Sequence, residues 1–125
     1  MIAGTPWSPA QAFIDAAQNL LTGVAEDDFG QAFRHLDANE DGSRWSKSQF
    51  LAQVRDRSSG RITSPLGHSK SARPVVDALV EGDVYELRHA IPIDGRWSDL
   101  VIVLRFARKE HSQYFHMRLV DVEAR

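Results

Sequence analysis

Two ionisable side chains in the second half of the chain stand in apolar, alternating sequence, where proton-transfer chemistry could be placed. His89 falls in a period-two series with Leu87 and Ile91, so a strand would hold its imidazole on the apolar face. Such a histidine is either a hydrogen-bonded core residue or a polar group in a pocket that titrates near neutral pH. Asp121 continues the alternation of Leu119, which would place a carboxylate on the same face, near the mouth of any cavity.

A short acidic segment looks like the first half of an EF-hand calcium loop. Asp37, Asn39 and Asp41 supply oxygens at the first, third and fifth ligand positions, and a glycine follows at the sixth. The second half departs from the pattern, because Arg44 replaces an apolar residue and Ser48 stands where a glutamate would give two oxygens. The same residue types form turns between helices. We therefore expect a weak or absent calcium site and assign no metal.

The remaining residue types indicate no catalytic or cofactor chemistry. Neither a Gly-x-Ser-x-Gly elbow nor a Ser-x-x-Lys motif surrounds the serines, and no phosphate-binding glycine pattern occurs. The chain has no cysteine, which excludes disulfides and thiolate metal sites. The five histidines show no spacing that makes a metal ligand set: His35, His68, His89, His111 and His116. We expect no cofactor and no nucleophilic catalysis.

Charged and aromatic residues indicate a protein-binding surface rather than a catalytic site. Charges such as Glu86, Arg88 and Arg105 fall opposite the apolar face of the expected strands, where they either form cross-strand pairs on a solvated surface or dock another protein. The acidic stretch in the first half is likewise either a solvated edge or a face for a basic partner. Arginine, tryptophan and tyrosine are common interface anchors. Our partner-binding candidates are Arg96, Trp97, Tyr114, Arg118, Asp27 and Asp28.

Composition places the chain among ordinary globular proteins. Its 125 residues suit one domain, and 42% hydrophobic with 26% charged residues argues against disorder. A net charge of −2 does not favour a nucleic-acid partner, and no apolar run approaches the roughly 20 residues of a membrane helix. The start lacks the basic head of a signal peptide, and the absence of cysteine fits a reducing compartment, so we expect a cytoplasmic protein.

The first half of the chain predicts helices over about residues 8–57. Ser8 begins a capping box ahead of a strongly amphipathic helix. Three acidic residues, 26–28, suit the first turn of a second helix, whose apolar face continues through Phe33 and Leu36. Ser46 begins a second capping box and a third helix.

The second half predicts a sheet over about residues 74–124, after a long loop at about 58–73. Within the loop, residues 61–64 could form a brief strand, and the paired valines of 74–80 favour a strand. From 84 to 122 the apolar residues alternate in three long runs. Asp94-Gly95 can supply the positive φ angles of a hairpin, and a polar turn at 108–112 joins the last two runs. The sheet is therefore an antiparallel, curved meander in an α+β fold.

This order of elements resembles the nuclear transport factor 2-like superfamily of cone-shaped α+β domains. The stretches that carry the resemblance are Ala10-Gln11-Ala12-Phe13, Trp45-Ser46-Lys47-Ser48-Gln49-Phe50 and Trp97-Ser98-Asp99-Leu100. The superfamily includes enzymes such as ketosteroid isomerase and scytalone dehydratase, inert ligand-binding domains, and immunity proteins that neutralise bacterial toxins. The resemblance therefore leaves more than one function open.

The resemblance implies two alternatives for this chain. An enzyme would have a pocket between helices and sheet, with His89 or Asp121 as its acid or base and Tyr85 as a hydrogen-bond donor. An immunity protein would bind a toxin domain through its surface, without catalysis. We expect the second, a noncatalytic cytoplasmic protein that occludes a bacterial toxin, and leave a homo-oligomer open. The small-molecule binder or enzyme is the alternative.

Overall fold

The computed structural model describes residues 1–4, 9–65, 75–80, 84–110 and 112–124. Helices occupy much of the first half and strands most of the second, as the sequence predicts. The elements in chain order are β1 (Ile2–Ala3), α1 (Pro9–Ala25), α2 (Phe29–Ala32), α3 (Lys47–Arg55), β2 (Val75–Val80), β3 (Val84–Ile93), β4 (Arg96–Arg108) and β5 (Tyr114–Ala124). The predicted capping box at Ser8 lies outside the described residues, as do 66–73 of the predicted loop.

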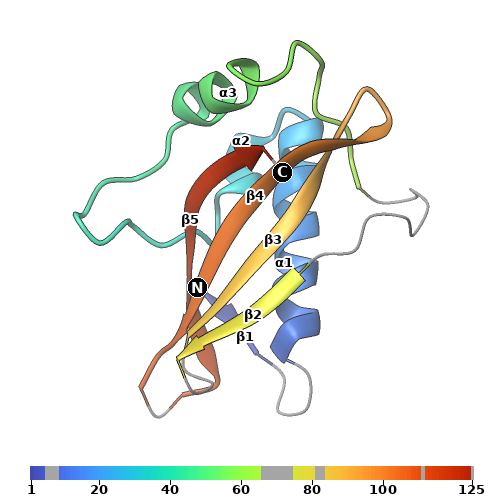
Figure 1. The fold of residues 1–125 in the computed structure, drawn as a ribbon. Helices are drawn as coiled ribbons and strands as arrows, with labels where there is room; N and C mark the ends of the chain where they lie inside the picture. Colours follow the sequence, from blue (N-terminus) through green and yellow to red (C-terminus); the bar gives the residue numbers. More distant parts are fainter. Residues whose placement is uncertain (5–8, 66–74, 81–83, 111, 125) are drawn as a thin grey trace.

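The strands form one curved, antiparallel sheet in the order β1-β5-β4-β3-β2 (Figure 1). The predicted meander from β2 to β5 is confirmed. Its β3–β4 hairpin closes as expected at Asp94 and Gly95, which have φ angles of 52° and 76°. The strand suggested at 61–64 is only a single bridge between Ile62 and Ile93. The short β1, which the sequence did not reveal, pairs with the start of β5.

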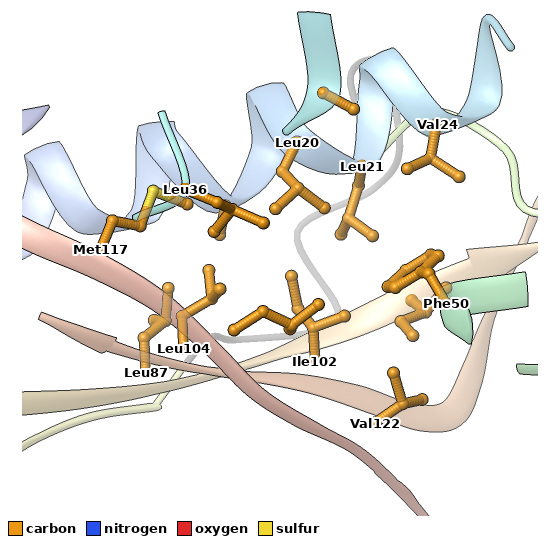
Figure 2. Packing of buried hydrophobic residues seen from close by; sticks show 14 of the residues in the cluster. Leu20, Leu21, Val24, Leu36, Phe50, Leu87, Ile102, Leu104, Met117 and Val122 are labelled. Atoms are coloured by element: carbon orange, nitrogen blue, oxygen red, sulfur yellow. The ribbon is translucent and has the colours of Figure 1, made fainter. Parts of the chain in front are cut away.

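The core lies between α1 and one face of the sheet. Leu20, Leu21 and Val24 of α1 point toward Ile102 and Leu104 of β4 (Figure 2). These side chains are at most 6% exposed. The amphipathic pattern of the helix and the period-two pattern of the strands therefore meet in one hydrophobic cluster, which provides the main driving force for folding.

The second helix is shorter than the sequence predicts. The acidic residues do not form its first turn, because Asp27 takes a positive φ of 60° and Asp28 is the N-cap, accepting a hydrogen bond from the Gln31 N–H. The helix ends at its C-cap, Phe33. Leu36 is still buried, but the next backbone N–H, of Asp37, donates to β5 rather than continuing a helix. The chain therefore passes from α2 through turns to the β5 edge, and the apolar spacing of residues 29–36 does not mark one continuous helix.

The third helix begins where the sequence predicts. The Ser46 hydroxyl accepts a hydrogen bond from the Gln49 N–H at 3.1 Å, and the Gln49 side chain accepts one from the Ser46 N–H at 3.0 Å. This reciprocal pair is a capping box. The helix buries Phe50 in the core (Figure 2), and Val54, one turn later, belongs to the same cluster.

Candidate functional site

The space between α1 and the sheet is filled by aromatic rings near Tyr85. The Phe13 ring stacks on Phe106 with centroids 4.2 Å apart, and its centroid lies 4.9 Å from that of Phe115 and 5.1 Å from that of Tyr85. The three phenylalanines are at most 1% exposed. Aromatic pairs at such distances are close-packed, so Tyr85 is part of the wall of the core.

His89 is a hydrogen-bonded core residue in this structure. It is 2% exposed and lies opposite Ile102, a core residue of β4. Its Nδ1 is 2.7 Å from the carbonyl oxygen of Ala90, which can only accept, so Nδ1 carries a proton. The imidazole also lies beside the Trp97 ring, with centroids 6.0 Å apart. Of the two alternatives for this histidine, the geometry matches the first.

Asp121 does not share the face of His89, and the prediction that it continues the apolar register is wrong. The pairing of β4 with β5 shifts by one residue, so that Leu119 lies opposite Leu104 but Asp121 lies opposite Val103. The extra residue is Val120, a β-bulge. Val122, 0% exposed, takes the core position instead. The three pocket candidates are therefore not brought together on one face.

Asp37, the first position of the calcium-like loop, is joined to the edge of β5. Its backbone N–H donates to the Met117 carbonyl at 2.8 Å, and its carboxylate accepts from the Met117 N–H at 2.9 Å. Burial raises the pKa of this carboxyl, but the Met117 hydrogen bond, the nearby terminal ammonium and His116 outweigh burial and hold the pKa below its ordinary value. Asp37 therefore satisfies the backbone N–H and carbonyl of Met117 at the β5 edge, as a neighbouring strand would.

The other two loop positions form a closed turn. The backbone carbonyl of Asn39 accepts from the Gly42 N–H, its backbone N–H donates to the Ser43 carbonyl, and its side-chain amide donates to the Ser43 hydroxyl. The Asp41 carboxylate accepts from both the N–H and the hydroxyl of Ser43, which lowers its pKa. These oxygens therefore serve the turn rather than converging with Asp37. Among the described residues, no group of three or more His, Asp or Glu side chains is placed to hold a metal ion.

A groove of about 870 Å³ is lined by Arg105, Arg118 and Val120 of the charged face of the sheet, and it extends to Leu119 and Trp45 at the margin of the core. It lies between the turn that follows Asp37, helix α3 and the strands, and we call it the outer groove. Its lining residues are Asn39, Glu40, Asp41, Ser43, Trp45, Gln49, Ala52, Gln53, Val84, Arg105, Ala107, Arg118, Leu119 and Val120. Its volume falls in the range of ordinary ligand sites, and none of the pocket candidates lines it.

Hydrogen bonds fix the two long sides of the outer groove. The Trp45 indole N–H donates to the Leu119 carbonyl at 2.8 Å and holds the turn against β5. Arg118, on β5, donates from Nε to the Ala38 carbonyl at 2.9 Å. Directly opposite it on β4, Arg105 donates to the Glu86 carboxylate at 3.0 Å. Two hydrogen bonds therefore hold the turn wall of the groove against β5, and a third links β4 to β3 within the sheet wall.

The predicted partner-binding residues do not form one patch. Arg118 lines the outer groove, whereas Arg96 and Trp97 begin β4 at the β3–β4 hairpin. Tyr114, 46% exposed, begins β5 beyond the other end of β4. A strand of 13 residues spans roughly 40 Å, so the two ends belong to separate surfaces.

The acidic candidates lie at a third place, between α1 and α2. Asp28 caps α2, and Asp27 pairs with Lys47 at 3.4 Å on an exposed surface. Asp27 also lines a second cavity of about 480 Å³, together with Arg55 and Arg61. Both carboxylates are therefore engaged in local structure, and the acidic run does not form a separate face.

The sequence did not identify Trp45, Arg105 and Val120 as residues that line one groove. Arg105 was assigned to the charged face, and the structure confirms its cross-strand pair with Glu86. Trp45 stands in a stretch that carries the family resemblance, and nothing in that stretch indicates a groove. Val120 gave no sign of its bulge, because an apolar residue beside a polar one fits either face of a strand.

Comparison with known proteins gives no match: no family model, curated protein or solved structure is significantly similar to this chain. No helix among the described residues has the length and apolar character needed to cross a bilayer. Fold and site therefore define a class only: an α+β protein with helices packed on a curved antiparallel sheet and a groove of mixed charged and apolar lining beside that sheet.

Proposed function

We propose that this protein is a noncatalytic protein-binding domain. The observation that carries the proposal is the contrast between the two faces of the sheet. The core face is filled around Phe13, and the candidate acid–base groups diverge. The opposite side bears charged pairs and an open groove. A filled interior leaves little room for a substrate, while charged and aromatic side chains beside a groove suit recognition of another protein.

In its finer form the proposal is a cytoplasmic immunity protein of nuclear transport factor 2-like fold, which neutralises a bacterial toxin by occluding it. The order of helices followed by a curved sheet supports this form, together with a size of 125 residues and a lack of cysteine. Neutralisation by occlusion requires only a complementary surface, without a catalytic set.

The test begins with native mass spectrometry of the tagged chain recovered from lysate of its source cells. We expect a protein partner at fixed stoichiometry, which is then purified and recombined with the chain. Co-expression must also relieve any toxicity of that partner. A bound small molecule with no protein, or turnover in a substrate screen, would overturn the proposal in favour of a pocket between helices and sheet.

Two sets of variants separate the alternatives. Arg96→Ala and Tyr114→Ala alter exposed positions at opposite ends of the sheet, so they change a surface without disturbing the core. His89→Gln changes a core imidazole while leaving the outer groove intact. A binding defect in a surface variant supports the proposal. An activity lost only in His89→Gln contradicts it.

A further inference from the structure

The sheet wall of the outer groove holds two arginines in an unfavourable arrangement. Arg105 and Arg118 lie directly opposite each other on β4 and β5. Residues paired in this way have Cβ atoms about 4.5 to 5.5 Å apart, and like charges there destabilise a sheet. An anion placed between the two guanidinium groups would relieve that repulsion.

The acidic side chains that the structure describes on β3, β4 and β5 only partly neutralise this wall. Glu86 Oε1 lies 2.6 Å from Arg88 Nη1, and Glu86 Oε2 lies 3.0 Å from Arg105 Nη2. One carboxylate therefore pairs with two guanidinium groups. Glu123 faces Arg88 at 3.8 Å. Arg118 forms no ion pair with any acidic group in the described part of the chain, and its Nε bonds to a neutral carbonyl. Among the described side chains, no carboxylate therefore balances the charge of Arg118.

Apolar side chains lie next to this charge. Val120, on the β5 bulge, is 42% exposed, and Trp45 and Ala107 line the same groove. An exposed valine gains by being covered, because each Å² of apolar surface removed from water contributes about 25 cal/mol. A ligand for the groove should therefore combine a carboxylate with an apolar group.

The rim opposite the two arginines is acidic, so the two sides of the groove differ in charge. Glu40 and Asp41 come from the turn, and the Asp41 carboxylate already accepts two hydrogen bonds from Ser43. Two carboxylates on that rim repel an incoming anion. A carboxylate must therefore enter toward Arg105 and Arg118, on the sheet side.

From this distribution we infer that the outer groove binds an acidic segment of the partner protein, in which an Asp or Glu is followed by an aliphatic side chain. The carboxylate lies between Arg105 and Arg118, and the aliphatic group packs on Val120 and Trp45. The inference rests on the proposed function, since it names the kind of segment that the partner presents. A bidentate contact between guanidinium and carboxylate supplies both energy and orientation.

The first test uses a defined probe, the acetylated and amidated peptide Gly-Ser-Glu-Leu-Ser-Gly, titrated into the ¹⁵N-labelled protein. We expect the amide signals of Leu119, Val120 and the Trp45 indole to shift. The matched peptide with Gln in place of Glu should bind at least tenfold more weakly, because it lacks the charge. Equal shifts with both peptides, or no shift near β5, would overturn the inference.

Variants then test whether peptide binding depends on positive charge in the outer groove. Val120→Glu places a carboxylate in the groove and should weaken peptide binding at least tenfold, whereas Val120→Lys should preserve or strengthen it. Both replace the same exposed valine with a longer polar side chain, so their effects on strand stability match. Arg118→Gln should weaken binding as Val120→Glu does, and Arg34→Gln, an exposed arginine outside the groove, should not. Identical behaviour of the two Val120 variants would contradict the inference.

Two controls identify the source of the carboxylate. Glutarate, which carries the charge without the peptide, should bind far more weakly than the Glu peptide, and equal affinity would overturn a protein segment as the ligand. A second copy of the chain is another source of carboxylates, so sedimentation is measured as well, and we expect a monomer. A dimer abolished by Val120→Glu would instead mean that a second copy occupies the groove, which also overturns the inference.

The two proposals fail in different ways. If a purified partner binds normally to both Arg118→Gln and Val120→Glu, the groove assignment is wrong while the protein-binding function stands. If the Glu peptide binds but no protein partner exists, the groove assignment stands and the proposed function is wrong.

Discussion

At the scale of single residues, Asp37 shows how a ligand-like carboxylate becomes structural. It accepts the Met117 N–H and lies 3.6 Å from His116 Nδ1, so its charge is used within the fold. Because the folded-state pKa lies below the ordinary value, this carboxylate stabilises the protein above the unfolded pKa, and the contribution disappears as pH falls through the folded pKa.

We predict that Asp37→Asn lowers the free energy of unfolding by about 1 to 2 kcal/mol at pH 6, because a charged hydrogen-bond acceptor becomes neutral. The difference from the unsubstituted protein should shrink as pH falls below about 4, where the unfolded state takes up a proton, and should vanish once the pH is below the lowered pKa of folded Asp37. Urea unfolding at pH 6, 4 and 3 measures this. Glu40→Gln, an exposed acid nearby, is the control and should show little effect. A difference that stays constant across this pH range would refute the assignment.

At the scale of elements, the N-terminus of α3 depends on its capping box. We predict that Ser46→Ala costs about 1 kcal/mol of stability, since the Gln49 N–H loses its acceptor. Ser48→Ala, at an exposed position in the first turn of the same helix, should cost nothing measurable, because alanine favours helix and no cap is lost. The urea midpoints of the two variants, compared with that of the unsubstituted protein, measure how much the capping bond contributes. Equal losses would mean that the cap bonds contribute little.

Local signals predicted some elements well and others poorly. The Ser46 box and the Asp94-Gly95 hairpin depend on neighbouring residues only, so the sequence was sufficient for both. The docking of Asp37 on Met117, 80 residues away, joins the segment after α2 to the sheet, and no local pattern contains that contact. The pairing of β1 with β5 is likewise a contact between distant segments.

At the scale of the whole molecule, the candidate site was harder to predict than the fold. Period-two alternation correctly placed His89 opposite a core residue, because the β3–β4 register is regular there. The same rule misplaced Asp121, because a single bulge at Val120 reverses the side of every later residue of β5. That bulge also exposes Val120 in the outer groove. One irregularity thus removed an expected pocket residue from the core face and added a residue to the outer site.

The filled interior that supports the proposed function can be tested through Phe13, whose ring contacts Tyr85, Phe106 and Phe115. We predict that Phe13→Ala lowers the free energy of unfolding by about 3 to 5 kcal/mol, the range for large-to-small changes in close-packed cores. Ile14→Ala, at the next and only partly buried position of α1, should cost less. Guanidinium unfolding of both variants gives the comparison. A loss below about 1 kcal/mol for Phe13→Ala would indicate a loosely packed interior, and the case for a small-molecule pocket between α1 and the sheet would then be the stronger one.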